Sequence, residues 1–364
     1  MEEQKYNMQG LDEYIRQSEP QKRERGEAWQ VAIGLQQVDG LTPSSYLLET
    51  ARQHIDGEIS INEAKKLIDS YYESARNRGE IEDDRTEEAD KVSARIAEIL
   101  SEKAFNFSPA QLISIHRRLF EGIYKLAGRI RDYNITKREW VLNGDTIYYA
   151  DYGTISETLE YDMRTEREFS YAGMPVDDAI RHLMRFCVNL WQIHAFCEGN
   201  TRTTAVFMIK YLRTLGFNVV NDVFAHNSWY FRNALVRANY RNLQKGITET
   251  TIYLERLFRS MLLGESYTFR NRELHIDWEK PVEESVPFQS AIPALNLSSK
   301  CKSCTLEEVA VLRIVQSNPA ATQKEIAAGI GKSERTVKTI TVTLQEKGIL
   351  RRVGGKRNGK WEII

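Results

Sequence analysis

One short stretch, residues 193–204, combines residue types that could transfer a group from a phosphate compound. His194 titrates near neutral pH and can accept a proton. Glu198 is a hard oxygen ligand of the kind that Mg²⁺ takes together with phosphates. Gly199 lets the backbone approach a ligand closely, and the guanidinium of Arg202 can pair with phosphate oxygens. A base, a metal carboxylate and an anion cradle therefore lie within nine residues.

Two apolar helical patterns bracket this stretch. Residues 177–193 begin with two acids and place apolar side chains on one helix face, so we expect a helix whose buried stripe ends at His194. Residues 203–215 are nearly all apolar and stop before Gly216, which indicates a buried helix. Its first N–H groups and Arg202 would converge on one point, as a phosphate site requires. A histidine, a Gly–Asn pair or an arginine alone is usually structural, but this order favours chemistry.

The stretch resembles the signature of the Fic family of AMP transferases, which reads His-x-Phe-x-(Asp/Glu)-Gly-Asn-x-Arg-x-x-Arg. Six fixed positions match, and they are His194, Phe196, Glu198, Gly199, Asn200 and Arg202. The resemblance implies a protein adenylyltransferase that moves AMP from Mg-ATP to a Ser, Thr or Tyr hydroxyl of a protein target, self-modification included. It therefore implies ATP and Mg²⁺ as cofactors.

The resemblance also implies a role for each matching residue. His194 would deprotonate the target hydroxyl, Phe196 would pack the loop into the core, and Glu198 would hold Mg²⁺. The residues that would bind ATP are Gly199, Asn200, Thr201 and Arg202. The chain departs from the signature at its last position, where Ala205 replaces an Arg. In the family this Arg helps to hold the γ-phosphate and pairs with an inhibitory Glu, so the loss bears on both ATP orientation and autoinhibition.

A hairpin is expected upstream of the motif. Trp140, Val141 and Leu142 precede Asn143-Gly144, and a second β-prone run follows over 146–149. Asn-Gly between two such runs is a strong hairpin signal. The preceding segments, 127–131 and 134–137, resemble the family's lead into its target-docking flap. We therefore expect Trp140, Val141 and Leu142 to dock an extended target segment beside His194; the alternative is a packed, inert hairpin.

The N-terminal residues predict a helical arm with helices over about 26–35, 45–54 and 62–74. It is similar to the helical antitoxins and fused arms that restrain Fic enzymes, whose inhibitory helix carries Ser/Thr-x-x-x-Glu-Gly. The corresponding residues are Leu35, Asp39 and Gly40, which makes Asp39 the candidate inhibitory residue; Ser45 with Glu49 is a second candidate. Because Asp39 is one methylene short and Ala205 removes its expected Arg partner, inhibition would be leaky or steric. An ordinary helical arm is the alternative.

The C-terminal residues differ from the rest in charge. Residues 301–364 hold 12 Lys and Arg against 6 Asp and Glu, a net charge of +6, whereas the remainder holds 38 against 45, a net charge of −7. Three helical patterns and two β-prone runs resemble a winged helix-turn-helix. A basic domain on an acidic body favours DNA as a partner. The candidate DNA-binding residues are Lys332, Arg335 and Lys338 on the third helix and Lys356 and Arg357 at the wing tip.

The sequence as a whole predicts a mainly α protein: a Fic-type helical bundle with one β-hairpin flap, plus a small winged-helix (α+β) domain. We assign residues 1–80 to the arm, 81–264 to the catalytic domain, 265–304 to a linker and 305–364 to the winged helix. Cys301 and Cys304 form a C-x-x-C pair without a second pair nearby, so we interpret them as incidental thiols.

The remaining expectations concern partners and location. The chain shows neither a signal peptide nor an apolar run of membrane length, so we expect a cytoplasmic protein without a membrane partner. The oligomeric state stays open, with a homodimer among the alternatives. Two other functions also stay open: a nucleotide-sensing DNA-binding regulator without catalysis, and a transferase that uses another donor.

Overall fold

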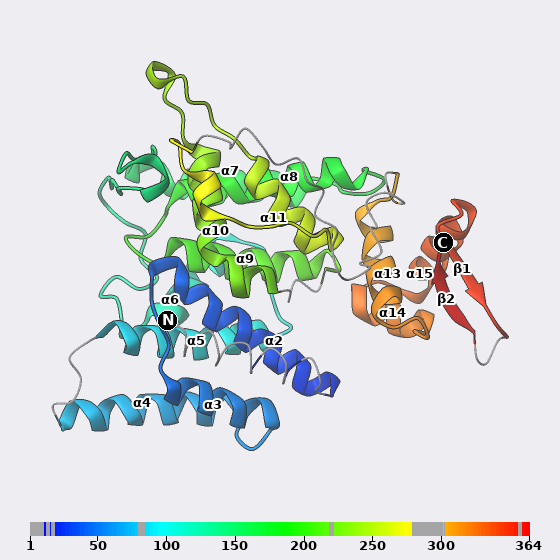
Figure 1. Cartoon of the computed structure of the whole chain (residues 1–364), viewed down its shortest axis with the longest axis horizontal. Helices are drawn as coiled ribbons and strands as arrows, with labels where there is room; N and C mark the ends of the chain where they lie inside the picture. Colours follow the sequence, from blue (N-terminus) through cyan, green and yellow to red (C-terminus); the bar gives the residue numbers. More distant parts are fainter. Residues whose placement is uncertain are drawn as a thin grey trace.

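The structure is a computed structural model that describes residues 11, 15, 19–78, 84–217, 222–278, 301, 303–355 and 359–364. The fold is mainly helical, as predicted, with one two-stranded antiparallel sheet in the described residues. Figure 1 shows two parts: a large helical body with the arm along its lower side, and a small C-terminal domain beside it.

The arm contains α2 (Pro20–Gly34), η1 (Leu35–Asp39), α3 (Ser45–Asp56) and α4 (Ile61–Asn77). Ser44 caps α3 by accepting the N–H of Leu47, and Ser60 with Glu63 forms a capping box at α4. The arm packs tightly on the body. Its helix α2 lies along α5 (Asp84–Ser101) and α10 (Asp222–Asn239), and Trp29 is fully buried.

The body adds α6 (Pro109–Phe120), η3 (Tyr152–Thr154), α7 (Ile155–Glu168), α8 (Val176–Ile193), α9 (Asn200–Thr214), η4 (Leu243–Lys245) and α11 (Ile252–Leu263) to α5 and α10. Ser108 caps α6 and Pro109 occupies its first position, as expected from the sequence. Every residue from Asn200 to Leu212 is buried, so α9 is the central rod against which α5, α6 and α8 pack.

The hairpin predicted at 140–149 is wrong. Trp140–Leu142 is one turn of 3₁₀ helix, η2, and no strand forms at 146–149. Val141 and Leu142 are consecutive and both fully buried, whereas a strand would send them to opposite faces. Asn143 takes a left-handed conformation (φ 56°) and ends the turn. The Asn-Gly pair therefore closes a helical turn that packs into the body.

Part of the predicted linker also belongs to the body. Residues 265–278 include η5 (Asn271–Leu274), and Leu274 is fully buried. The Ile276 N–H donates to the Val141 carbonyl at 2.9 Å, and the Tyr253 hydroxyl donates to the Glu273 carbonyl at 2.7 Å. This segment therefore packs against η2 and is joined to it by a hydrogen bond. Residues 279–300 lie outside the described residues.

The C-terminal domain contains α13 (Leu306–Ser317), α14 (Gln323–Ile330), α15 (Glu334–Glu346), β1 (Leu350–Val353) and β2 (Lys360–Ile363). Each helix begins at a capping hydroxyl, from Thr305, Thr322 and Ser333 respectively. The strands pair antiparallel with Leu350 opposite Ile363. This order of three helices and a two-stranded wing confirms the predicted winged helix.

The winged helix contacts the outer ends of α8 and α9. The Val176 N–H at the start of α8 donates to the Cys304 carbonyl at 2.9 Å. Gly216, after the end of α9, lies so close to Ile330 that an added Cβ would come within 3.2 Å of it. The thiols of Cys301 and Cys304 are free and buried at this junction.

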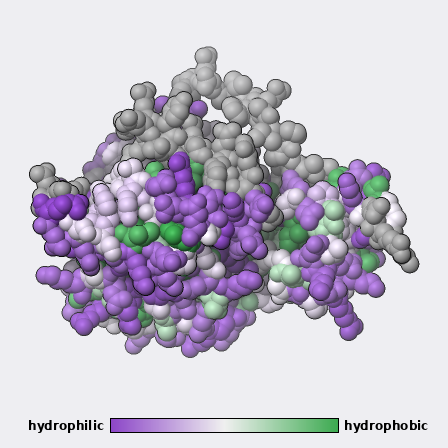
Figure 2. Space-filling model, turned by 90° about the horizontal axis from the view of Figure 1, so that it is seen from below, coloured by the Kyte–Doolittle hydropathy of each residue, from purple (hydrophilic) through white to green (hydrophobic). Residues whose placement is uncertain are grey.

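One face of the described structure is largely polar. Hydrophilic side chains cover most of the face seen in Figure 2, with small apolar areas between them. Among the described helices, none combines the length and the hydropathy needed to cross a membrane.

Candidate active site

The histidine of the motif stands at the end of α8. The helix begins after Pro175 and ends where His194 turns into the left-handed region (φ 48°, ψ 57°). This conformation is strained for a residue with a side chain and needs support from its surroundings. Arg131 supplies that support: its Nε donates to the His194 carbonyl at 2.8 Å, and its own N–H donates to the Ala195 carbonyl at 2.9 Å. The Arg131 side chain is itself buried.

One ring nitrogen of His194 makes a hydrogen bond and the other has no partner. Nδ1 lies 3.3 Å from the Trp191 carbonyl, which can only accept, so Nδ1 carries the proton and Nε2 presents its lone pair. Nε2 is buried without a hydrogen-bond partner, and the Tyr149 ring covers the imidazole at a centroid distance of 4.2 Å. Burial, followed by the positive charge of Lys137, holds the pKa of His194 well below its usual value. His194 is thus an unprotonated base at neutral pH.

The loop between α8 and α9 is fixed from inside. Phe196 stacks on the His116 ring at a centroid distance of 3.7 Å, so it packs the loop into the core as predicted. His116 accepts the Gly128 N–H at Nδ1 (2.8 Å), which leaves Nε2 to donate to the Glu198 carbonyl (2.9 Å). The Asn200 side chain closes the loop by bonding both the N–H and the carbonyl of Phe196 (2.9 and 2.6 Å).

Gly199 caps α9 in the left-handed region, with φ 75°. An added Cβ would lie 2.3 Å from Cε2 of Phe120, so both the conformation and the space require glycine. The Thr201 hydroxyl accepts the Trp191 indole N–H at 2.9 Å and ties the first turn of α9 to the last turn of α8. The first amides of α9, which have no intrahelical acceptor, thus start beside His194.

Arg202 is fully buried, and protein groups already occupy its guanidinium. Its Nε lies 2.8 Å from Asp39 Oδ2, and one Nη lies 2.6 Å from Glu88 Oε1. The other Nη donates to the Gln36 side chain at 3.0 Å. Burial alone would lower the pKa of Arg202, but the two carboxylates raise it above its usual value. Arg202 is therefore a permanent cation whose charged partners are Asp39 of the arm and Glu88 of α5, and the Tyr124 hydroxyl also accepts from its guanidinium at 2.9 Å.

The position of Asp39 corrects one expectation. Ala205 was expected to leave Asp39 without its Arg; instead the Asp39 carboxylate meets Arg202, one turn earlier on α9. The contact is possible because Asp39 is the last residue of η1, which Gly40 caps (φ 67°), and η1 packs against α9. Asp39 also lines a cleft of about 610 Å³ together with Gln37, Val38, Gly40, His226, Trp229, Arg232 and Asn271.

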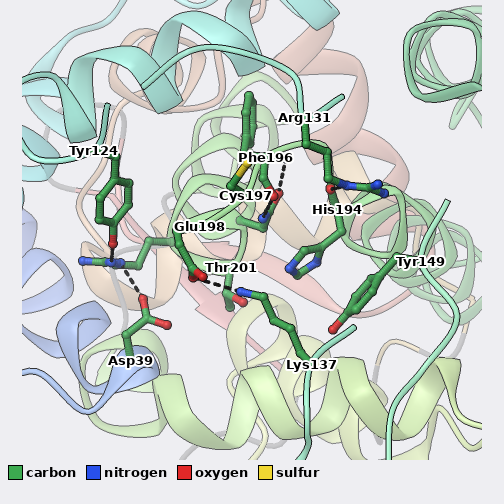
Figure 3. Close-up of polar contacts among 12 residues, drawn as sticks. Asp39, Tyr124, Arg131, Lys137, Tyr149, His194, Phe196, Cys197, Glu198 and Thr201 are labelled. Atoms are coloured by element: carbon green, nitrogen blue, oxygen red, sulfur yellow. Dashed lines mark hydrogen bonds and ion pairs between the residues drawn. The ribbon is translucent and has the colours of Figure 1, made fainter. Parts of the chain in front are cut away.

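Glu198 extends from the loop toward solvent. Its side chain is 60% exposed, and its Oε2 lies 2.9 Å from Nζ of Lys137. Figure 3 shows the Lys137 amine pointing at this carboxylate, with the His194 and Tyr149 rings beside it. Among the described residues, no cluster of three or more His, Cys, Asp or Glu could hold a metal alone. One exposed carboxylate beside a helix N-terminus instead fits Mg²⁺ that arrives with phosphates, which supply its other ligands.

The predicted docking residues are only partly available. Trp140 is 49% exposed and its ring contacts that of His275, but Val141 and Leu142 are fully buried. The segment beside His194 is instead 148–150, where Gln192 on α8 donates to the Tyr148 carbonyl at 3.0 Å. The Tyr148 side chain is 85% exposed. The sequence placed residues 146–149 in the second run of the expected hairpin and docking in the first, although Tyr148 and Tyr149 were a signal for this segment.

The candidate DNA-binding residues divide into three groups. Arg335 and Lys338 are exposed on α15, the third helix of the domain. Lys332 precedes α15 and pairs with Glu307 on α13 at 2.7 Å. Lys356 and Arg357 lie outside the described residues.

Two parts of the chain match models of known protein families. Residues 106–212 match the model of the Fic/DOC family, and residues 308–351 match that of a winged helix-turn-helix DNA-binding domain. One solved structure, a Fic family protein from Desulfovibrio desulfuricans G20, aligns over 100% of this chain and 95% of its own at 12% identity, with a TM-score of 0.44. The search of curated proteins gives no match.

Proposed function

Because the chain carries a Fic/DOC family domain at 106–212 and a winged helix-turn-helix at 308–351, we propose that it is a protein adenylyltransferase with a DNA-binding domain. The observation that carries the proposal is the buried, unpartnered Nε2 of His194 at the end of α8, a helix that the Trp191–Thr201 hydrogen bond joins to the first turn of α9. A base and an anion-binding helix end at one place are what AMP transfer to a hydroxyl requires.

The proposed reaction is an in-line displacement at the α-phosphorus of ATP. His194 Nε2 takes the proton of a Ser, Thr or Tyr hydroxyl, the hydroxyl oxygen bonds to the α-phosphorus, and pyrophosphate leaves. Gly199, Asn200, Thr201 and Arg202 would bind the phosphates through the first amides of α9 and the guanidinium. Glu198 would hold Mg²⁺, which supplies charge neutralisation to the phosphates when it is bound.

The same contacts support an inhibited resting state. The Asp39 carboxylate lies 2.8 Å from Nε of Arg202, the Tyr149 ring covers that of His194, and Lys137 pairs with Glu198. A nucleotide would therefore have to displace side chains of the chain itself. We propose Asp39 as the inhibitory residue, because its carboxylate takes the place of a phosphate oxygen on Arg202.

Labelled ATP tests the transfer. The Asp39→Ala variant and the Asp39→Ala/His194→Ala double variant are incubated with Mg²⁺ and ATP labelled at the α-phosphate, and protein-bound label is measured. We expect label on the single variant or on an added protein, and none with the double variant. Equal label with both, or none with either while ATP still binds, contradicts the proposal.

A second candidate function is a DNA-binding regulator that senses nucleotide without turnover. Ala205 in the place of a phosphate-binding Arg, together with the occupied Arg202, favours it. Retention on DNA that changes with ATP, in a chain that transfers no AMP, would support this function over the transferase.

A further inference from the structure

We infer that Lys137 is a nucleotide-specificity residue. Its ammonium moves from Glu198 to the phosphates beyond the α-phosphate, and it supplies there the positive charge that Ala205 lacks. The inference rests on the proposed function, because it names the group that recognises the ATP of that same site.

The first argument is the shortage of cations around the start of α9. A triphosphate needs positive charge along its length, and the guanidinium of Arg202 is already paired with Asp39 and Glu88. Position 205, one turn further on the same helix, holds a fully buried alanine and offers no charge. A second phosphate-binding cation must therefore come from another segment.

The second argument is the position of Lys137. Its Nζ lies 2.9 Å from Glu198 Oε2, and its positive charge helps to lower the pKa of His194. The ammonium thus lies between the base and the metal carboxylate, on the side of Thr201 (Figure 3). The proposed reaction places the phosphate chain in this space.

The third argument is that the Lys137–Glu198 ion pair is partly exposed, whereas the guanidinium of Arg202 is fully buried. The Lys137 and Glu198 side chains are 25% and 60% exposed, and such exposed pairs contribute little to stability. Lysine is also a point charge on a flexible stem, so it can follow a phosphate. When Lys137 moves to the nucleotide, the Glu198 carboxylate becomes free for Mg²⁺. One movement would therefore complete both the phosphate site and the metal site.

Nucleotide binding tests the inference without relying on turnover. The dissociation constants of ATP and AMP are measured by calorimetry at constant Mg²⁺, in a His194→Ala background that prevents transfer. Lys137→Gln and Lys137→Arg are compared with Lys66→Gln, which removes an exposed lysine of α4. We expect Lys137→Gln to weaken ATP by about tenfold or more relative to AMP, because a charged hydrogen bond to a terminal phosphate is lost. Lys137→Arg should keep most of the preference.

Each outcome separates this inference from the proposed function. An ATP-to-AMP preference unchanged in Lys137→Gln, or undetectable ATP binding to the parent, overturns the role of Lys137. AMP transfer can still be present in the first case. Conversely, the preference for ATP over AMP can depend on Lys137 while the chain transfers no AMP. That result contradicts the proposed transferase function and supports the role of Lys137. Thermal melting of each variant identifies any loss that comes from unfolding.

Discussion

The carboxylate of Asp39, the last residue of η1 in the N-terminal arm, lies 2.8 Å from Nε of Arg202, on the first turn of α9. The arm and the motif are thus joined by a direct ion pair to a residue with no exposed surface. Glu88 and Gln36 pair with the two Nη groups of Arg202, so Asp39 is the anion nearest Nε, and another anion can take its place. A phosphate oxygen is such an anion.

The first prediction concerns this pair. Asp39→Ala should tighten ATP binding and raise any AMP transfer by about tenfold, because the phosphate no longer competes with a carboxylate for Arg202. Glu49→Ala is the matched control, since Glu49 is an acidic residue of the same arm that pairs only loosely with Arg52 on the surface. Equal ATP affinity in Asp39→Ala and the parent, with both variants folded, would show that Asp39 does not inhibit.

The second prediction concerns Gly199. Gly199→Ala combines a positive φ with a Cβ placed 2.3 Å from the Phe120 ring, so we expect a loss of about 2–4 kcal/mol in the free energy of unfolding. Gly144→Ala is the control, because its φ is similar (80°) but an added Cβ has nothing within 4 Å. It should lose only about 1–2 kcal/mol. Equal losses in urea unfolding would mean that Phe120 does not restrict this position.

Local signals in the sequence predicted much of this structure. The Ser108-Pro109 start of α6, the end of α8 at His194 and the buried α9 follow from capping residues and apolar spacing. The hairpin failed because neighbouring Val141 and Leu142 are both covered by distant segments of the body, a tertiary effect that Asn143-Gly144 does not reveal.

The partners of the motif could not be predicted in the same way. Gln36 and Arg202 are 166 positions apart, and Lys137 and Glu198 are 61 apart. Contacts at such separations leave no spacing to recognise in one sequence. A buried arginine such as Arg131 is likewise indistinguishable from a solvated one until the carbonyls around it are known.

The third prediction concerns pH and His116. Burial, helped by the positive charge of Arg202, lowers the pKa of His116 to about 4, although its hydrogen bond to the Glu198 carbonyl acts in the opposite direction. A lowered pKa in the folded state stabilises the fold above the ordinary histidine pKa, and this contribution is lost as the pH falls from about 6.5 through 4. The melting temperature of His116→Gln should therefore lie below the parent at pH 7, with a gap that narrows toward pH 4. A gap independent of pH would show that the pKa of His116 is not lowered in the folded protein.

The last prediction concerns DNA. Arg335 and Lys338 are exposed on α15, so Arg335→Ala and Lys338→Ala should each weaken binding to a mixed-sequence duplex and lower the slope of log affinity against log salt by about 1. Fluorescence anisotropy at several salt concentrations measures both quantities. Lys66→Ala, on the arm, should change neither. If the α15 variants match the parent at every salt concentration, this helix does not lie against DNA. The role of the winged helix would then be to pack against the ends of α8 and α9.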